Sequence, residues 1–232
     1  MKTLAVIPAR GGSKRIPGKN VRPFLGKPII SYPIRAALDA GIFDEVMVST
    51  DDREVAEIAK SFGARVPFLR SRDSSDDYSN LTDVLREVVG KYEEEGKLFE
   101  MIALIYATAP LLTADRIREG FDLLRKGTHN AVLYVVRFGH PAQRAMIINS
   151  GRLSFLYPEN AGSRSQDLQA TYHDAGQLLW ITRDAFLREK ILPGSDAYAV
   201  ELPAAEVQDI DTIEDWEMAE HKYRFLSTRN KQ

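Results

Sequence analysis

Short apolar runs alternate with longer amphipathic segments along most of this chain, and this alternation restricts its fold more than any other feature. The apolar runs are rich in β-branched residues such as Val46, Val48 and Thr50, which is typical of buried strands. Strands that alternate with helices predict an α/β fold, a mostly parallel sheet with helices on both faces. The predicted strands are 3–7, 45–50, 101–106, 131–136, 177–181, 197–202 and 207–210, and the predicted helices are 28–41, 53–62, 81–92, 114–126 and 213–225.

Residues that favour helix ends flank the predicted helices. Pro28 suits the first turn of a helix, and Gly41 suits the left-handed conformation that follows a last turn. Asp51 or Asp52 can cap the second helix, and Thr113 can cap the fourth. These signals agree with the helix boundaries that the alternation indicates.

The alternation stops after residue 136. Two short strand-like stretches, 145–148 and 153–156, are separated by Asn149-Ser150-Gly151, a sequence that favours a tight turn. We interpret residues 137–172 as a small inserted β-rich lobe that contains a hairpin. A chain of 232 residues is long enough for a sizeable core, so we expect one domain over residues 1–232.

Composition excludes several kinds of protein. The formal net charge is -2 and the basic cluster lies in one loop, so a small polyanion is the expected partner and a nucleic acid is not. Without cysteine the chain has no disulfide, thiolate zinc ligand or cysteine nucleophile. The N-terminal apolar run, Leu4 to Ile7, is too short for a signal peptide or a membrane span, so we expect a cytoplasmic protein with no membrane partner.

The segment IPARGGSKRIPGKN, residues 7–20, directly follows the first predicted strand. Ligands of open parallel sheets bind beyond the carboxyl ends of the strands, and Gly11 and Gly12 allow the backbone to approach a ligand closely. The spacing matches neither a Walker A loop nor G-x-G-x-x-G. The alternative is a flexible basic linker, which the position after a buried strand disfavours. The groups suited to a triphosphate are Arg10, Ser13, Lys14, Arg15 and Lys19.

Asp209 and Asp211 flank Ile210 in a predicted strand, which would turn both carboxylates to one face and the isoleucine to the core. Their Cβ atoms would then lie roughly 7 Å apart. Two such carboxylates, together with substrate phosphates, suit Mg²⁺, or Mn²⁺ in its place. In the alternative interpretation Asp211 caps the last helix, with Glu214 in a capping-box arrangement, and both roles can coexist.

Four segments together resemble the cytidylyltransferases that activate eight- and nine-carbon sugar acids, and the resemblance extends over nearly the whole chain. It implies a Rossmann-like nucleotidyltransferase fold with CTP and a sugar acid as substrates. It also implies a homodimer in which the inserted lobe reaches the sugar pocket of the partner. The four segments are residues 7–20, FDEVMVSTDD (43–52), GARVPFLR (63–70) and DIDT (209–212).

The same resemblance implies roles in a nucleotide site. Lys19 would meet the reacting α-phosphate, and a divalent cation would lie on the two aspartates. The cytosine would be read by Arg70, Ser79 and Thr82. The CTP phosphates and ribose would be bound by Arg10, Gly11, Gly12, Ser13, Lys14, Lys19 and Asn20. The residues implied to carry catalysis, through positioning and charge neutralisation, are Arg10, Lys14, Lys19, Asp209 and Asp211.

Later segments are similar to the branch of this family that uses pseudaminic acid, a nine-carbon sugar acid. Relatives that use sialic acid carry a glutamine-proline-threonine-serine-proline run and an arginine-proline-asparagine-glycine motif, and this chain departs from both. The segments are YATAP (106–110), HPAQRA (140–145), RSQD (164–167) and YHDAGQ (172–177).

By residue type alone, His173 is typical of a surface or packed histidine and Asp174 of a turn. An arginine such as Arg144 or Arg164 can bind a sugar carboxylate with two parallel hydrogen bonds. The residues that the resemblance implies around the sugar are Tyr106, Thr108, Gln143, Arg144, Arg164, His173, Asp174 and Gln177.

The expected reaction is attack by the anomeric hydroxyl of pseudaminic acid on the α-phosphorus of CTP, which gives a CMP-sugar and pyrophosphate. The nearest alternative is the same reaction with N-acetylneuraminate, legionaminate or Kdo. A second is a sugar-1-phosphate uridylyl- or guanylyltransferase, because GG-x-x-x-R-x-P-x-K loops also serve those enzymes. A third is a non-catalytic nucleotide-binding or regulatory module, against which the acidic pair argues. No general base is evident.

Overall fold

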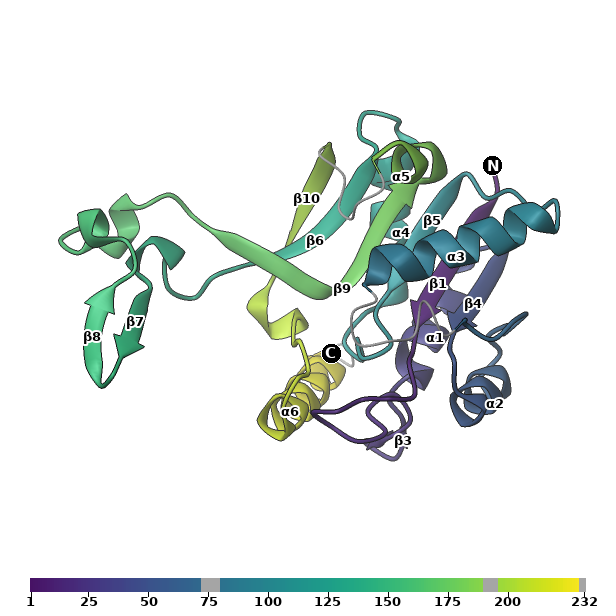
Figure 1. Cartoon of the computed structure of the whole chain (residues 1–232), viewed down its shortest axis with the longest axis horizontal. Helices are drawn as coiled ribbons and strands as arrows, with labels where there is room; N and C mark the ends of the chain where they lie inside the picture. Colours follow the sequence, from purple (N-terminus) through teal and green to yellow (C-terminus); the bar gives the residue numbers. More distant parts are fainter. Residues whose placement is uncertain (72–79, 190–195, 230–232) are drawn as a thin grey trace.

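The computed structural model describes residues 1–71, 80–189 and 196–229. At its centre lies a six-stranded sheet (Figure 1) in which β9 runs antiparallel to both neighbours and the other strands run parallel to one another. The mostly parallel sheet is thus confirmed. The strand order is β10 (Ala197–Leu202), β6 (Ala131–Arg137), β9 (Tyr172–Thr182), β5 (Met101–Ile105), β1 (Thr3–Pro8) and β4 (Glu45–Ser49).

Helices cover both faces of the sheet, as predicted. Leu4 and Val6 of β1 belong to an apolar cluster with α3 (Leu81–Glu94) and α5 (Arg183–Glu189). Ala5 and Ile7 belong to a second cluster, because successive side chains of a strand point to opposite faces. The helices of this second face are α1 (Ser31–Ala40), α2 (Arg53–Ser61) and α4 (Ala114–Arg125).

A third apolar cluster joins the C-terminal helix α6 (Ile213–Arg229) to the segment that follows β1. Ile16 and Ile210 are fully buried in it, together with Trp216 of α6. The ring of Phe24 packs edge-on against Trp216, with 5.7 Å between ring centroids. Residues 16 and 210, distant in the sequence, therefore share one core.

Most predicted helix ends are confirmed. Gly41 follows α1 with a φ of 67°, Asp52 caps α2, and Thr113 caps α4. The helix predicted to begin at Pro28 begins at Ser31 instead. The reason is that Pro28 belongs to the short antiparallel pair of β2 (Pro23–Phe24) with β3 (Lys27–Pro28).

Two strand predictions near the C-terminus are corrected. β9 begins at residue 172 rather than 177, because residues 172–174 also pair with β6. Its register shifts on the way, since Leu133 lies opposite Leu179 but Val135 lies opposite Asp174, so β9 bulges between these pairs. The strand predicted at 207–210 does not form, and the acidic pair lies on an irregular segment between a 3₁₀ turn (Ala204–Glu206) and α6.

The hairpin predicted in the lobe is confirmed. β7 (Met146–Asn149) pairs antiparallel with β8 (Arg152–Phe155), and Ser150 and Gly151 turn between them with φ values of 49° and 77°. Figure 1 shows this lobe standing away from the sheet and from α6. Within the described ranges, no helix is long and apolar enough to cross a membrane. Three 3₁₀ turns complete the lobe: Ala142–Arg144, Pro158–Asn160 and Ser165–Asp167.

Candidate active site

The basic segment leaves the carboxyl end of β1, where β4 lies on one side and β5 on the other. Open α/β sheets bind ligands at such a switch in strand order. The amide of Ala9 donates to the carbonyl of Ser49 (2.9 Å), and the amide of Gly11 donates to the carboxylate of Asp51 (3.0 Å). These bonds fix the start of the segment to the end of β4, so the interpretation as a free linker is wrong here.

The two glycines serve different purposes. A Cβ atom on Gly11 would lie 2.5 Å from Oδ2 of Asp52, the residue that caps α2, so only glycine fits there. No heavy atom lies within 4 Å of the corresponding position on Gly12, and Gly12 is exposed. The Gly11 amide, expected at the phosphates, is bonded to Asp51, whereas Gly12 leaves its backbone open to a ligand.

Asn20, expected beside the nucleotide, is buried in the fold. Its side-chain amide donates to the carbonyl of Arg10 (2.9 Å) and so ties together the two ends of the basic segment. In the stretch that this bond closes, Arg10 and Lys14 are exposed and Ser13 is half-buried. Asn20 therefore supports the shape of the segment on which these three residues lie.

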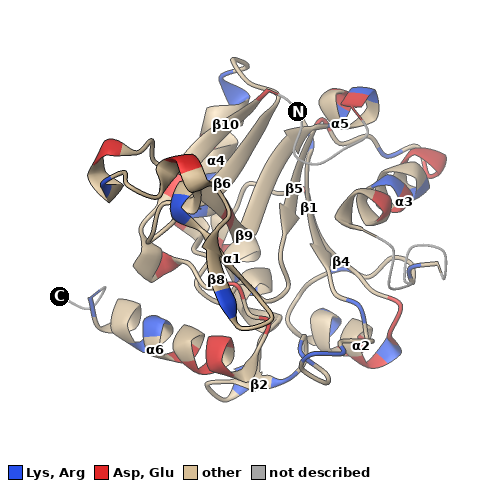
Figure 2. Cartoon of the chain, turned by 60° about the vertical axis from the view of Figure 1, so that its left-hand side comes forward, with Lys and Arg blue, Asp and Glu red and all other residues tan. Residues whose placement is uncertain are grey.

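The far end of the basic segment meets the acidic pair. Arg15 forms an ion pair with Asp211 at 2.5 Å, and Nζ of Lys19 lies 3.6 Å from Oδ1 of Asp211. Lys19 also donates to the carbonyl of Ile210 and is 17% exposed, whereas the Arg15 side chain is 67% exposed. In Figure 2, blue Lys and Arg positions lie along the loop drawn between the labels β2 and α2, and red Asp and Glu positions lie in the first turns of α6.

Asp209 is exposed, whereas Asp211 is half-buried. The surrounding chain nevertheless partly desolvates the Asp209 carboxyl and so raises its pKa; the charge of Asp211 raises it further, while Lys19 opposes the shift. The bulge of β9 passes beside it, because a Cβ atom on Gly176 would lie 3.5 Å from the Asp209 carboxyl carbon. The two carboxylates thus repel each other.

Asp211 does not cap α6, so that alternative is wrong. Thr212 takes this place: its hydroxyl accepts from the amide of Asp215 (3.2 Å), and the Asp215 carboxylate accepts from the amide of Thr212 (2.8 Å). This reciprocal pair is a capping box. The predicted partner Glu214 is exposed, and the Asp211 carboxylate remains with the basic segment.

The acidic pair fits a divalent cation that also binds a triphosphate. Within the part of the chain that the structure describes, no three acidic or histidine side chains gather into a metal site. Mg²⁺ commonly takes one or two carboxylates and completes its shell with water and substrate phosphates. A cation would relieve the repulsion that raises the pKa of Asp209 beside Asp211.

The residues expected at the cytosine lie along β4 and α3. Arg70 is buried, and its Nε donates to the hydroxyl of Ser49 (3.1 Å), while its backbone amide donates to Thr50 (2.8 Å). Burial lowers the pKa of its guanidinium. Thr82 is half-buried in the first turn of α3, and Ser79 lies outside the described residues.

Several residues expected at the sugar lie together where β5 ends beside β9. The hydroxyl of Tyr106 donates to Oδ2 of Asp174 (3.4 Å), and burial together with this carboxylate raises the pKa of Tyr106. The other oxygen of Asp174 accepts from the amide of Gly176 (2.7 Å). Exposed His173 contacts the carbonyl of Asp174 (2.9 Å), and Thr108 lies in the turn after β5.

Gln177 is placed differently from its expected role. It is 2% exposed, and its side-chain amide donates to the carbonyl of Glu206. This contact joins β9 to the turn before the acidic pair. We therefore count Gln177 among the residues that support the site.

The remaining predicted sugar residues lie in the lobe. Arg164 pairs with Asp167 (2.8 Å), and Arg144 donates to the hydroxyl of Ser165 (3.3 Å). The amide of Gln143 donates to the carbonyl of residue 169 (2.9 Å). The lobe stands away from the sheet (Figure 1). Within a single chain, the predicted sugar residues of the lobe are therefore separated from those at the end of β5 and in β9.

Comparisons with known proteins agree with this geometry. A family model described as cytidylyltransferase matches residues 4–191. The chain belongs to the cytidylyltransferase family. It is 41% identical over 225 residues to a pseudaminic acid cytidylyltransferase of Campylobacter jejuni, with 97% of each chain covered. It is 31% identical over 219 residues to an N-acylneuraminate cytidylyltransferase of Streptococcus agalactiae, with 93% of this chain and 52% of that protein covered.

A solved structure supports the fold of this cytidylyltransferase. The structure of a CMP:2-keto-3-deoxy-manno-octonic acid synthetase complexed with CTP has a TM-score of 0.72 with this chain. The match covers 95% of this chain and 98% of the other, at 20% identity. The Rossmann-like nucleotidyltransferase fold is thereby confirmed.

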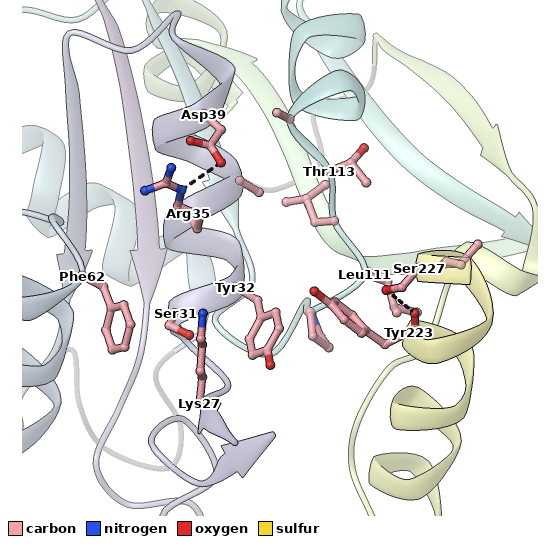
Figure 3. Close-up of a pocket in the computed structure, with 15 residues that line it drawn as sticks. Lys27, Ser31, Tyr32, Arg35, Asp39, Phe62, Leu111, Thr113, Tyr223 and Ser227 are labelled. Atoms are coloured by element: carbon pink, nitrogen blue, oxygen red, sulfur yellow. Dashed lines mark hydrogen bonds and ion pairs between the residues drawn. The ribbon is translucent and has the colours of Figure 1, made fainter. Parts of the chain in front are cut away.

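Two cavities of similar size lie beside α6 of this cytidylyltransferase. One, of about 480 Å³, is lined by His173, Asp209 and Asp211, together with Asp215 and Lys222 of α6. The other, of about 510 Å³, lies between α1, residues 110–114 and α6 (Figure 3). None of the predicted site residues that the structure describes lines the second cavity. Three predicted site residues, His173, Asp209 and Asp211, thus line the first cavity, and no residue of the basic segment is among its lining residues.

Three residues of the site were not predicted. Asp51 holds Gly11, and it follows β4 at the same sheet edge as the basic segment, a position that could have indicated it. Asp215 and Lys222 line the first cavity, beside Asp209 and Asp211. In the sequence these two are ordinary members of the polar face of a helix, and no motif marks them.

Proposed function

We propose that this chain transfers CMP from CTP to the anomeric hydroxyl of pseudaminic acid and releases pyrophosphate. The observation that carries the proposal is the contact between Lys19 and Asp211, which joins a segment suited to a triphosphate with a carboxylate pair suited to its cation. Similarity to the Campylobacter jejuni protein over 97% of both chains supports pseudaminic acid as the sugar.

In this proposal CTP lies along the basic segment, with its phosphates against Arg10, Lys14 and Lys19. Lys19 stands at the α-phosphate, because it is an enclosed cation of the segment that also contacts the acidic pair. Asp209 and Asp211 hold Mg²⁺ or Mn²⁺, which when bound neutralises phosphate charge. The cytosine lies toward Arg70, Ser79 and Thr82, and the neutral donors for the phosphates are Gly12 and Ser13.

The reaction forms a bond from the anomeric oxygen to the α-phosphorus and breaks the bond from that phosphorus to the oxygen shared with the β-phosphate. The hydroxyl loses its proton, and no side chain forms a covalent bond. Transfer of this kind depends mostly on aligning the two oxygens and on neutralising charge. Fixed cations such as Lys19, whose side chain is largely enclosed, serve this purpose.

The proposed sugar pocket consists of Tyr106, Thr108, His173 and Asp174. Tyr106 contacts Asp174, His173 lines a cavity with Asp209 and Asp211, and Gly176 in the bulge of β9 lies beside Asp209. We propose a homodimer in the cytoplasm, in which the lobe of each subunit adds Gln143, Arg144 and Arg164 to the pocket of its partner. Apolar side chains on the lobe support this arrangement: Ile148 is 72% exposed and Leu153 is 64% exposed.

Pyrophosphate release by the purified chain with CTP and Mg²⁺ tests the function. Pseudaminic acid, N-acetylneuraminate, N,N'-diacetyllegionaminate and Kdo are compared, with UTP and GTP as nucleotide controls. We expect kcat/KM for pseudaminic acid to exceed the others by at least about tenfold, which corresponds to about 1.4 kcal/mol of selective binding. A preference for another acid would refute the sugar assignment, and no release with any acid would refute the enzyme assignment.

The second candidate substrate is legionaminic acid. Over 135 residues the chain is 39% identical to a CMP-N,N'-diacetyllegionaminic acid synthase of Legionella pneumophila, with 58% of each chain covered. Pseudaminic acid remains the first choice because the similarity to the Campylobacter jejuni protein extends over nearly the whole chain. The comparison of sugar acids separates the two directly.

A further inference from the structure

The acidic pair lies on a segment that no strand pairing holds. Residues 207–210 are irregular, and two buried side chains anchor them: Val207 in the core cluster of the second sheet face and Ile210 in the third apolar cluster. A metal-binding pair needs its carboxylates held to within about 0.5 Å, and a segment without ladder hydrogen bonds does not provide this by itself. Side chains of α6 supply hydrogen bonds on both sides of the pair.

Asp215 holds the C-terminal side. Its Oδ2 accepts from the amides of Asp211 (3.1 Å) and Thr212 (2.8 Å) and from the hydroxyl of Thr212 (2.8 Å). Its Oδ1 accepts from the side-chain amide of Gln208 (3.2 Å). One carboxylate thus binds residues on either side of Asp209, so its contacts extend beyond the cap of α6.

Lys222 holds the N-terminal side. It lies two helical turns after Asp215 and so faces the same segment. Its ammonium donates to the carbonyl of Val207 (2.6 Å) and to that of Ala204 (3.0 Å). These bonds fix the backbone that enters the acidic pair, and they leave the cap of α6 untouched.

We propose that Asp215 and Lys222 are positioning residues that fix the segment 204–212, so that Asp209 and Asp211 bind the divalent cation together with CTP. The inference rests on the proposed function, because it takes the acidic pair as the cation site. Outer residues that orient metal ligands typically change metal affinity by about 10–100-fold when removed. Both residues act through backbone and side-chain contacts, without touching the cation.

The test measures Mn²⁺ binding in the presence of CTP, from the electron paramagnetic resonance signal of free Mn²⁺. Lys222→Met and Asp215→Ala are compared with controls on the same helix, Arg224→Met and Glu214→Ala, which remove the same charges at exposed positions. We expect Mn²⁺ to bind about tenfold or more weakly in both test variants and within about twofold of wild type in both controls. Lys222→Arg, which keeps the donors, should recover most of the affinity.

Thermal unfolding of each variant separates positioning from folding. Asp215→Ala removes half of a capping box, so reduced stability alone would not support the proposal; Lys222→Met leaves the cap intact and decides the matter if Asp215→Ala does not fold. Wild-type Mn²⁺ affinity in Lys222→Met would overturn the inference. Pyrophosphate release by the wild-type chain tests the proposed function separately, so the two failures remain distinguishable.

Discussion

Replacement of Lys19 by methionine tests the junction between the basic segment and the acidic pair. Nζ of Lys19 lies 3.6 Å from Asp211, which corresponds to a gross attraction of about 4–5 kcal/mol at an effective dielectric constant of about 20. Arg15 also neutralises Asp211, and the Asp211 side chain is 35% exposed, so we expect folding stability to fall by only about 1 kcal/mol. That loss corresponds to a decrease in melting temperature of about 2–4 °C.

Activity should fall far more than stability in this variant. Removal of one preorganised donor at a developing charge typically costs about 2.7–4 kcal/mol, or about 10²–10³ in kcat. The assay is pyrophosphate release at saturating CTP and Mg²⁺, with melting followed by circular dichroism. Arg15→Met is the matched control: it removes a second contact to Asp211 from a side chain that is 67% exposed, and we expect less than about a tenfold loss. Turnover of Lys19→Met within about threefold of wild type would refute our reasoning.

Three further predictions concern the metal pair, the core and the lobe. Asp211→Asn should lower kcat/KM by about 100-fold or more and raise the Mg²⁺ concentration for half-maximal rate, whereas Glu214→Gln in the same region should do neither. Gly120→Ala should lose about 1–3 kcal/mol in urea unfolding, because its Cβ would lie 2.5 Å from a core tryptophan. In Gly90→Ala, where the Cβ position is open, stability should be unchanged or slightly higher. Ile148→Asp should sediment as a monomer with reduced turnover, and an inactive dimer would contradict the role given to the lobe.

Local sequence signals predicted the helix ends well and the conformation of the segment around the acidic pair less well. The helix ends at Gly41, Asp52 and Thr113 follow from the backbone of a few neighbouring residues, and the structure confirms them. The prediction of a strand at 207–210 was wrong, because the alternation of polar and apolar residues in Asp209-Ile210-Asp211 does not come from strand pairing. Ile210 is buried against α6 and the basic segment, without any strand partner.

The capping of α6 shows a similar limit. Asp211 and Thr212 are both good capping residues by type, and each precedes an acidic residue by the same spacing of three positions, Glu214 and Asp215 respectively. The choice of Thr212 depends on Arg15 and Lys19, which draw the Asp211 carboxylate to the basic segment. These cations lie about 190 positions earlier, so no local pattern contains the information.

The sequence by itself determined the α/β class, the position of the basic segment after the first strand, and the family resemblance that names the nucleotide and the sugar acid. These follow from periodicity and motifs, which depend on residues near one another in the chain. Only the tertiary structure decided that Ile16 and Ile210 share a core, that Lys19 thereby meets Asp211, and that Asp215 and Lys222 hold the acidic pair. Burial and hydrogen bonding between distant segments depend on how the whole chain packs, and that packing brings the basic segment to the acidic pair.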